Sequence, residues 1–386
     1  MFQKEQQLIE DKIKAYSAAN DVPLAELKWQ PIPFSGEWGV STSFFQTAAN
    51  EARAGKGNKV PVPQRAQEIA EQVKAEIGSV PGISRVEAVK GYLNLYYTTS
   101  EYARRVVDEV LASRADFGRG APKAERVMVE YAQPNTHHSF HIGHARNTIL
   151  GEVLARLVEF AGFETIRATY PGDMGLSVIT VVWAYEKFYK GQEPEGIHER
   201  GRWLLKIYAE ATAKLGPKEN ETPEEKAQRE GYDAERREML RKWEANDPYV
   251  VELWRVTREW SLEEFRDILR ILDVKMDVWF YESEANKLGK EIVDELIARG
   301  IAEDERAQGG PVIVKIDEKL GLTKEKYRTM VILRSDGTTL YSTKDLALAK
   351  QKFEQYHVDR SIYVVDFRQS LHFNQVFKIL ELWGFP

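Results

Sequence analysis

A change of hydrophobic pattern at Val127 constrains the fold of this chain more than any other feature. Residues 127–132 (VMVEYA) form an apolar run typical of a strand, residues 164–170 (ETIRATY) form another, and HIGHARN, a glycine-containing segment, lies between them at 141–147. After this segment, apolar residues recur with the spacing of one helix face, namely Ile149, Val153, Leu157 and Phe160. Strand, helix and parallel strand in this order predict an α/β fold, a doubly wound parallel sheet of the Rossmann-like, nucleotide-binding kind with ligands at the carboxyl ends of its strands.

The length of 386 residues is large for one core, so we expect more than one domain. Helical spacing at 1–20 and 63–77, a pair of short strands that turns at Lys90 and Gly91, and a helix behind a serine cap predict a small α+β unit. Residues 117–125 (FGRGAPKAE) are rich in Gly and Pro and indicate a boundary. The expected domains are an N-terminal α+β domain over 1–118 and the sheet domain over 119–386.

Two insertions are expected inside the second domain. Residues at about 190–260 are crowded with charge, and we interpret them as a solvated helical hairpin inserted in the sheet rather than an element that grips RNA. A β-rich insertion is expected at about 300–335, and the sequence over 330–342 predicts a hairpin that turns around Gly337. The apolar run at 361–366 (SIYVVD) predicts a buried parallel strand, and a helix from Ser370 follows it.

Charge and composition exclude several classes of protein. The net charge is −6 and the pI is about 5.8, which argues against nucleic-acid binding by bulk electrostatics alone. There is no cysteine, so disulfides and cysteine nucleophiles are excluded and a reducing compartment is permitted. Charged residues interrupt the apolar positions of residues 1–20, which therefore predict neither a signal peptide nor a membrane span. We expect a cytoplasmic protein without membrane contact.

Four of the seven histidines lie within residues 135–147 (NTHHSFHIGHARN). A metal site is one interpretation, because His141 and His144 are three apart, but neither a cysteine nor a carboxylate at the usual spacing accompanies them. A capped turn with incidental imidazoles is another. We favour phosphate chemistry, because a helix N-terminus attracts anions, imidazoles donate to phosphate oxygens, and Gly143 lets a nucleotide approach the backbone. No metal ion is expected.

These residues resemble a known family. The segment 129–175 looks like the catalytic core of class I aminoacyl-tRNA synthetases, with His141, Ile142, Gly143 and His144 as the HIGH signature. A glutamate and a Pro-Asn pair ahead of HIGH, and then RSDGTTLYSTKDLALA (334–349) and VVDFRQSLHFNQVF (364–377), follow the order and spacing of the arginine-specific members. Because the first 115 residues also resemble the N-terminal tRNA-contacting domain of that family, the resemblance to arginyl-tRNA synthetases covers the whole chain.

The resemblance implies a role for each residue that matches a family motif. His141 and His144 are the expected catalytic residues, which stabilise charge at the α-phosphate. The residues expected to bind ATP are His138, Ile142, Gly143, Gly172, Asp173, Asp366, His372 and Phe373. The residues expected to bind L-arginine are Glu130, Asn135, Tyr341, Asp345 and Gln369. Among these, the carboxylates hold the guanidinium, whose planar set of donors needs bidentate acceptors.

Structural alternatives exist for single residues of this set. In these alternatives, Asp345 caps a helix, Tyr341 is a strand residue packed on a hairpin, and Glu130 is a charged residue on an edge strand. The sequence also departs from the family: His138 stands where a lysine is common, GDMG (172–175) replaces GDWG, and no KMSKS loop is present. We therefore expect a truncated form that lacks the KMSKS loop and the anticodon-binding domain.

The implied function is that of an arginine–tRNA ligase. Such an enzyme activates L-arginine with ATP, which carries Mg²⁺, to arginyl-adenylate and transfers the arginyl group to tRNA(Arg). No tightly bound cofactor and no editing domain are expected, and a monomer is expected. The alternatives are a catalytically weak tRNA-binding fragment or paralogue of the same family, and another HIGH-type nucleotidyltransferase that acts on a small molecule. Arginine-dependent ATP–pyrophosphate exchange distinguishes them.

Overall fold

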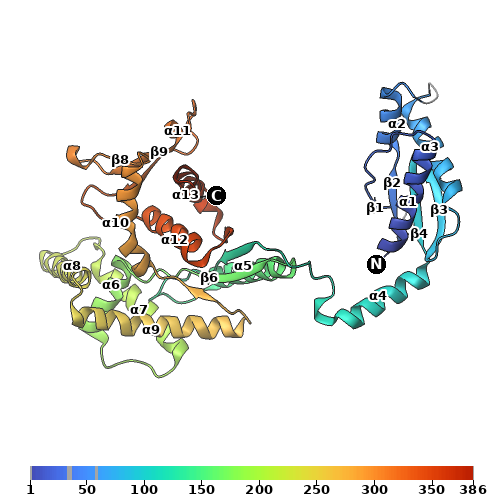
Figure 1. Cartoon of the computed structure of the whole chain (residues 1–386). Helices are drawn as coiled ribbons and strands as arrows, with labels where there is room; N and C mark the ends of the chain where they lie inside the picture. Colours follow the sequence, from blue (N-terminus) through green and yellow to red (C-terminus); the bar gives the residue numbers. More distant parts are fainter. Residues whose placement is uncertain (1, 33–36, 57–59, 386) are drawn as a thin grey trace. The chain divides into compact units, whose positions relative to one another are not determined.

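The computed structural model describes residues 2–32, 37–56 and 60–385. The chain divides into two compact units, Met1–Gly118 and Arg119–Pro386 (Figure 1). Each unit has hydrophobic clusters of its own, so each is described by itself. Within the described residues, no helix is long and apolar enough to cross a membrane.

The first unit is a four-stranded antiparallel sheet covered by helices. Its elements are α1 (Gln3–Ala19), β1 (Gln30–Pro31), β2 (Gly39–Ser43), α2 (Phe45–Arg53), α3 (Val62–Ile77), β3 (Ile83–Val89), β4 (Tyr92–Tyr97), α4 (Thr99–Ser113) and the 3₁₀ turn η1 (Arg114–Asp116). The strands lie in the order β1, β2, β4, β3. Helices α1 and α3 pack on the sheet through Ile9, Ile13, Ile69, Val73, Leu93 and Leu95.

Local sequence signals explain most of this unit. The predicted helices and the predicted pair of strands are confirmed, and the turn between the strands places Lys90 at φ +50° and Gly91 at φ +84°. Two successive left-handed residues match the right-handed twist of the paired strands. The predicted serine cap of α4 is wrong: the N-cap residue is Thr98, whose side chain makes no capping hydrogen bond, and Ser100 lies inside the first turn.

The second unit is built on a four-stranded parallel sheet, which confirms the predicted fold class. Its strands β5 (Arg126–Glu130), β6 (Glu164–Thr169), β7 (Val278–Trp279) and β11 (Arg360–Tyr363) lie in the order β11, β5, β6, β7. All three pairings are parallel. The strand order reverses direction between β5 and β11, which is where doubly wound sheets bind their ligands.

Helices cover both faces of this sheet. Apolar side chains alternate along β5, so both faces of the strand are apolar and both are buried. Val127 and Val129 face a cluster that includes residues of α5 (Ile142–Phe160) and α9 (Pro248–Ile271). Met128 points the other way, into a cluster with Leu348 of α12 (Tyr341–Tyr356). A strand buried on both faces explains why its sequence is an unbroken apolar run.

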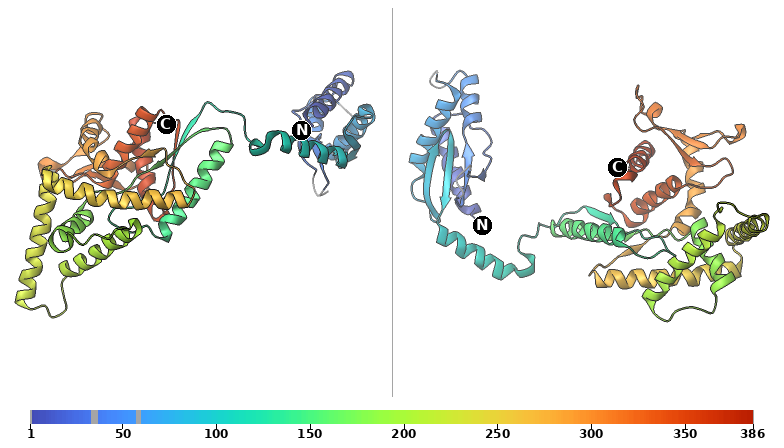
Figure 2. Two further views of the ribbon diagram at one scale, coloured as in Figure 1. Left: turned by 90° about the horizontal axis from the view of Figure 1, so that it is seen from below. Right: turned by 180° about the vertical axis from the view of Figure 1, so that it is seen from behind.

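The charged insertion between β6 and β7 is more than a solvated hairpin. It contains α6 (Leu176–Ala184), a π-helical segment (Tyr185–Tyr189), α7 (Ile197–Leu215), α8 (Pro223–Glu244) and α9, gathered on one side of the unit (Figures 1 and 2). Helix α8 buries no residue, as predicted for a solvated element. Helix α7, however, buries Leu204 and Ile207 in a cluster rich in aromatic rings, so the prediction of a solvated hairpin is wrong for α7.

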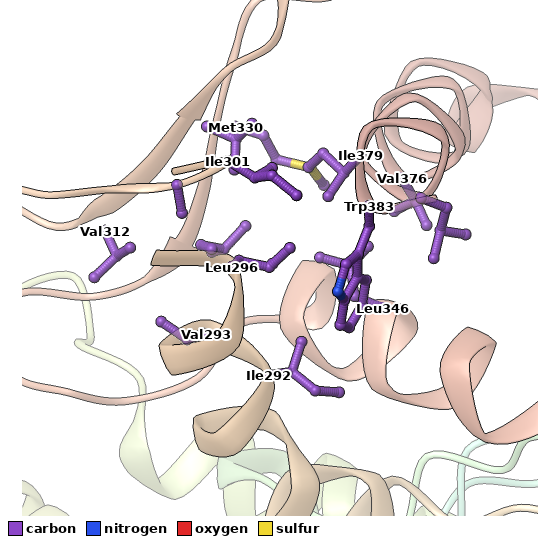
Figure 3. Close-up of a cluster of buried hydrophobic side chains, with 14 of the residues drawn as sticks. Ile292, Val293, Leu296, Ile301, Val312, Met330, Leu346, Val376, Ile379 and Trp383 are labelled. Carbon is purple, nitrogen blue, oxygen red and sulfur yellow. The ribbon is translucent and has the colours of Figure 1, made fainter. Parts of the chain in front are cut away.

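The second insertion and the end of the chain form another layer. Its elements are α10 (Glu282–Ala298), β8 (Glu303–Asp304), the 3₁₀ turn η3 (Arg306–Gln308), β9 (Val312–Lys315), α11 (Ile316–Lys319), β10 (Thr329–Leu333), α12, the 3₁₀ turn η4 (Phe367–Gln369) and α13 (Ser370–Trp383). Strands β10, β9 and β8 form an antiparallel sheet. Figure 3 shows how α10, α12 and α13 meet this sheet through Leu296, Leu346, Ile379 and Trp383.

The predicted hairpin over 330–342 is largely replaced by a helix. Leu333 forms a single bridge with Thr339, and the chain enters α12 at Tyr341. Ser342 Oγ donates to the carbonyl of Val331, and the Thr343 hydroxyl donates to the next carbonyl of β10. These two hydrogen bonds tie the first turn of α12 to β10, where the second strand of a hairpin would have run, so the prediction of a complete hairpin is wrong.

Candidate active site at the carboxyl ends of the parallel strands

Loops that follow the four parallel strands meet at the reversal of strand order. Asn147, in the second turn of α5, ties them together: its Oδ1 accepts from the backbone N–H of Ala132 at 2.6 Å, and its Nδ2 donates to the carbonyl of Val364 at 2.7 Å. Ala132 follows β5 and Val364 follows β11. The amide therefore fixes the start of α5 against both strand ends.

His141 and His144 stand at the start of α5 with their rings stacked at 3.9 Å. The backbone N–H of Gly143 donates to His141 Nδ1 at 3.0 Å, and that of His141 donates to His144 Nδ1 at 3.4 Å. Because each Nδ1 accepts a hydrogen bond, a neutral ring carries its proton on Nε2. Both histidines thus offer an Nε2–H donor near a helix N-terminus, where backbone N–H groups also favour an anion.

Burial keeps part of this histidine cluster neutral. Burial, together with the nearby imidazoles of His141 and His138, lowers the pKa of His144 to about 4. Burial and His141 also lower the pKa of His138, whose ring meets the ring of Tyr208 edge-on at 4.6 Å. His144 is therefore a neutral hydrogen-bond donor at pH 7 rather than a cation.

A buried histidine anchors the loop between β5 and α5. His137 is fully buried; its backbone N–H donates to Ser261 Oγ at 2.8 Å, and its Nε2 lies 2.8 Å from Thr257 Oγ1, both on α9. The loop needs this anchor because Ala132 and Gln133 take positive φ values of 72° and 45°, a conformation unfavourable for residues with a Cβ. Helix α9 thus holds the loop that carries the HIGH residues.

A second group of charged residues lies where α10 meets α12. Glu282, which follows β7, is buried, and its Oε1 accepts from Lys344 Nζ at 2.6 Å. Asp345, the next residue on α12, lies with its Oδ2 2.5 Å from His372 Nε2 on α13. Burial raises the pKa of Glu282, the bond from Lys344 opposes the shift, and the charges of Asp173 and Asp345 raise the pKa further.

Two tyrosines face this pair of carboxylates. Tyr341 is 72% exposed at the start of α12, and the charge of Glu282, partial burial and the charge of Asp345 raise its pKa. Burial and the surrounding carboxylates, Asp345 first among them, raise the pKa of Tyr170, which follows β6. In the described part of the chain, the buried Tyr170 hydroxyl has no hydrogen-bond partner. The Tyr170 hydroxyl, which can both donate and accept a hydrogen bond, is thus free to bind a ligand near the two carboxylates.

Asn135 and Gly172 bring the loops after β5 and β6 together. A Cβ at position 172 would lie 2.3 Å from Asn135 Oδ1 and 3.3 Å from Glu282 Oε2, so a larger residue there would push the Asn135 side chain away. Asn135 itself is exposed. The predicted arginine-binding residue Asn135 therefore lies beside the carboxylate of Glu282, as Asp345 and Tyr341 do.

Asp173 has a structural environment that does not suit contact with ATP. It is fully buried, its Oδ2 lies 2.8 Å from Arg258 Nε on α9, and its two oxygens accept from the backbone N–H and the hydroxyl of Ser283. Trp254 Nε1 also donates to its carbonyl oxygen at 2.7 Å. The prediction that Asp173 contacts ATP disagrees with this burial; the residue joins the loop after β6 to α9 and α10.

Glu130 and Phe373 are likewise enclosed. Glu130 is 1% exposed and lies 2.5 Å from Nζ of Lys352, which is 0% exposed, while Gln133 Nε2 donates to its other oxygen. The Lys352 ammonium also stands over the ring of Tyr363 at 4.0 Å. Glu130 is thus already paired and enclosed in the core, and its predicted contact with arginine stays a prediction.

Phe373 lies within a cluster of rings with Tyr363 and Phe377 and is almost fully buried. Its predicted contact with the nucleotide is therefore not available to its side chain. The remaining predicted residues are accessible: Ile142 is 85% exposed at the tip of α5, Gln369 lies on the surface of η4, and Asp366 caps η4 while Arg368 holds its pKa down at about 2.

Sequence reasoning missed Glu282, Lys344 and Tyr170. Two signals were available: Tyr170 ends the strand ETIRATY, and Glu282 follows the short apolar stretch VWFY (278–281), so both occupy the position after a parallel strand where site residues concentrate. Strand β7 has only two residues, which made that stretch hard to identify as a strand. Lys344 had no signal of its own apart from its place between Tyr341 and Asp345.

Comparison with known proteins finds arginine-specific class I tRNA synthetases both among family models and among curated relatives. Residues 106–386 match the model of the family described as tRNA synthetases class I (R), catalytic domain. The chain is 36% identical over 330 residues to an arginine–tRNA ligase of Bdellovibrio bacteriovorus, covering 86% of this chain and 53% of that protein. It is 32% identical over 374 residues to one of Bacteroides fragilis, covering 95% and 59%. The chain thus spans little more than half the length of these curated relatives.

Solved structures share the fold. The arginyl-tRNA synthetase of Plasmodium falciparum matches with a TM-score of 0.65 and 17% identity, covering 99% of this chain and 62% of that one. The arginyl-tRNA synthetase of Thermus thermophilus matches with a TM-score of 0.60 and 19% identity, covering 98% and 63%. At such low identity these matches establish the arrangement of the chain rather than its chemistry.

Proposed function

The chain belongs to the arginyl-tRNA synthetase family of class I, and from this membership we propose that it activates L-arginine with ATP and transfers the arginyl group to tRNA(Arg). The proposed substrates are L-arginine, ATP with its Mg²⁺, and the tRNA. In the first step, a carboxylate oxygen of arginine attacks the α-phosphate of ATP and pyrophosphate leaves. In the second, a hydroxyl of the terminal ribose of the tRNA attacks the carbonyl carbon of arginyl-adenylate and AMP leaves. We further propose a cytoplasmic monomer.

The pair of carboxylates at the ends of α10 and α12 carries this proposal. Glu282 and Asp345 lie close enough for the charge of Asp345 to raise the pKa of Glu282, and each is held in this structure by the nitrogen of another side chain. A guanidinium is planar, always charged and has five donors, so two carboxylates suit it better than one. Tyr170, with an unpartnered buried hydroxyl, adds a further acceptor beside them.

Asn135 supports the placement of the other end of the substrate. Its exposed amide lies beside Gly172 and near Glu282 Oε2, so it can bind the α-amino or carboxylate group of a bound amino acid. Gln369 is exposed on the loop after β11 and is proposed to contact the same end. The substrate carboxylate then points toward the HIGH residues at the same edge of the sheet.

The nucleotide site is proposed at the start of α5. His141 and His144 present Nε2–H donors there, and the free N–H groups of the first helical turn add to them. These donors do not depend on protonation of His144, since its pKa of about 4 leaves it neutral at pH 7. They would stabilise the negative charge that develops on the α-phosphate oxygens in the transition state.

The first unit is proposed to contact the tRNA. It carries aromatic side chains that stack at its surface: Trp38 is 57% exposed and lies 4.9 Å from the ring of Tyr102. Exposed rings offer platforms for unpaired bases, which suits recognition of a folded RNA by shape and stacking. The strand tyrosine Tyr96 is not available for this role, because it is buried beneath Arg85.

Arginine-dependent ATP–pyrophosphate exchange tests the proposal. We expect the chain to catalyse exchange with L-arginine when tRNA(Arg) is present, and we expect Asp345→Ala to weaken arginine binding by about 10- to 100-fold, because it removes a charged acceptor. Glu354→Ala, on the exposed side of the same helix, is the matched control and should leave binding unchanged.

Two results would contradict parts of this proposal. Unchanged arginine affinity in the Asp345→Ala variant would remove Asp345 from the site. Tight binding of tRNA(Arg) without any exchange, both by this chain and by a version extended past Pro386, would favour the alternative of a tRNA-binding protein of the same family that has lost its catalytic function.

A further inference from the structure

Lys344 forms an ion pair with Glu282, the carboxylate proposed to bind the guanidinium of the substrate. Its side chain is largely buried on α12, one residue before Asp345, and its Nζ donates to Glu282 Oε1 at 2.6 Å. The same ammonium lies 3.8 Å from the sulfur of Met174 and 5.4 Å from the centre of the Tyr341 ring. A cation of the protein itself thus stands in the pocket proposed for the substrate guanidinium.

The two cations compete for the same oxygen. A guanidinium binds a carboxylate best with two parallel N–H···O bonds, which requires both oxygens. Glu282 Oε2 faces Gly172 and Asn135, but Oε1 is taken by Lys344. Oε1 can accept a second hydrogen bond, but a guanidinium bound to both oxygens would stand beside the Lys344 ammonium, and the repulsion between the two cations favours release of Oε1 by Lys344.

The structure provides room for Lys344 to leave. A cavity of about 820 Å³ is lined by Lys344, Met174 and Ser283, and also by the charged residues Glu244, Asp336, Lys290 and Arg334. A displaced ammonium can move into this space and remain hydrated among charges of both signs. The flexible four-carbon side chain of lysine allows such a movement by rotation about its own bonds.

We propose that Lys344 is the resident counter-ion of Glu282, which the substrate guanidinium displaces. This inference rests on the proposed function and adds a positioning residue that sets specificity. A lysine substrate presents to Glu282 the same ammonium group as Lys344. Lys344 is part of the chain and therefore has the higher effective concentration at Glu282, so free lysine displaces it poorly. A guanidinium gains a second hydrogen bond and can displace Lys344, so the resident lysine favours arginine over lysine.

Calorimetric titration at pH 8 with L-arginine and with L-lysine tests this inference on the full chain. We expect Lys344→Met to bind arginine at least about fivefold more tightly than the parent, because no competing cation remains, and to bind lysine measurably. Lys344→Arg should bind arginine more weakly than the parent, since an internal guanidinium holds Glu282 through two bonds.

Lys350→Met is the matched control. Lys350 also lies on α12 and donates to a glutamate of α10, Glu295, at 2.7 Å, but this pair is outside the site. We expect its arginine affinity to equal that of the parent. Thermal unfolding of each variant checks that it is folded, and Lys344→Arg, which keeps the charge, serves if Lys344→Met does not fold.

The outcomes distinguish failure of the counter-ion role of Lys344 from failure of the proposed function. Unchanged or weaker arginine binding by folded Lys344→Met, or tighter binding by Lys344→Arg, would overturn the counter-ion role while leaving the proposed function intact. Tighter binding by Lys350→Met to the same extent would overturn it as well. Absence of arginine binding by the parent and by every variant, with and without tRNA(Arg), would overturn the proposed function and this inference together.

Discussion

Two ion pairs at the carboxyl edge of the sheet differ in their exposure to solvent. Glu130 and Lys352 form a pair that is shut off from solvent, whereas Asp345 and His372 form a pair that solvent and ligands reach. A buried pair of this kind stabilises only while both partners are present, because a single remaining charge loses its hydration without compensation. Glu130 therefore belongs to a core pair, whereas Asp345 stays accessible for the role that we propose for it.

Removal of one partner tests this distinction. Lys352→Met leaves Glu130 as an unpaired buried charge, and we expect it to lower the free energy of unfolding by about 3 to 5 kcal/mol. Lys350→Met, on the same helix but in a partly exposed pair, should cost at most about 1 kcal/mol. Urea unfolding followed by circular dichroism measures both.

The double variant Glu130→Gln/Lys352→Met removes both charges and should recover most of the loss. Equal costs for Lys352→Met and Lys350→Met would show that burial of the Glu130–Lys352 pair has no special weight.

Local pattern predicted the elements better than it predicted their buried faces. The helical spacing of Ile149, Val153 and Leu157 correctly indicated α5, yet all three side chains are about half exposed. The helix is instead buried along Thr148, Gly151, Glu152 and Ala155. The reason is Tyr131: a Cβ at Gly151 would lie 2.2 Å from its ring, so the glycine creates the contact surface and an apolar stripe does not.

Interactions between elements also decide how the HIGH loop is held, and they make its stability sensitive to pH. Burial, together with the charges of His138 and Arg258, lowers the pKa of His137 to about 3. The unfolded chain, with an ordinary histidine pKa near 6.5, binds a proton between these values that the folded chain does not. The contribution is complete above about pH 6.5 and is lost as the pH falls toward 3.

We therefore expect the free energy of unfolding to fall by up to about 1.4 kcal/mol per pH unit for this histidine as the pH is lowered from 6 to 4. His137→Asn, a residue that tolerates the φ of +63° found here, should show a slope smaller by about that amount. Urea unfolding at a series of pH values gives the slope, and an identical slope in the two proteins would contradict the burial of a neutral His137.

At the scale of the whole molecule, each unit carries its own means of folding. Unit 1 has a complete cluster of buried residues contributed by α1, α3 and β4, and its size is typical of an independent domain. Unit 2 has four further clusters, each made within residues 119–386. Nothing in the described core of either unit requires a side chain of the other.

A polypeptide of residues 1–118 is expected to fold alone, with a cooperative thermal transition and dispersed amide signals in a proton–nitrogen NMR spectrum. The separate unit 2 polypeptide, 119–386, is the complementary sample. Amide signals of the 1–118 polypeptide confined to the narrow range of an unfolded chain would show that the first unit depends on the second.

Features that depend on neighbouring residues were predictable from the amino-acid sequence. The strand–helix–strand order around HIGH, the turn at Lys90 and Gly91, and the helix from Ser370 all follow from local spacing and turn chemistry, and the structure has them. Family motifs also indicated Asp345, Asn135 and Tyr341, which the structure places around one carboxylate.

The partners of long charged side chains, in contrast, depend on tertiary packing. It paired Glu130 with Lys352, enclosed Asp173 with Arg258, and introduced Glu282 and its lysine into the pocket. Each pair joins residues far apart in the chain, so its formation depends on how helices and strands pack and on which groups lose water together. Local periodicity carries no information about either, and for that reason the elements could be predicted while the state of each carboxylate could not.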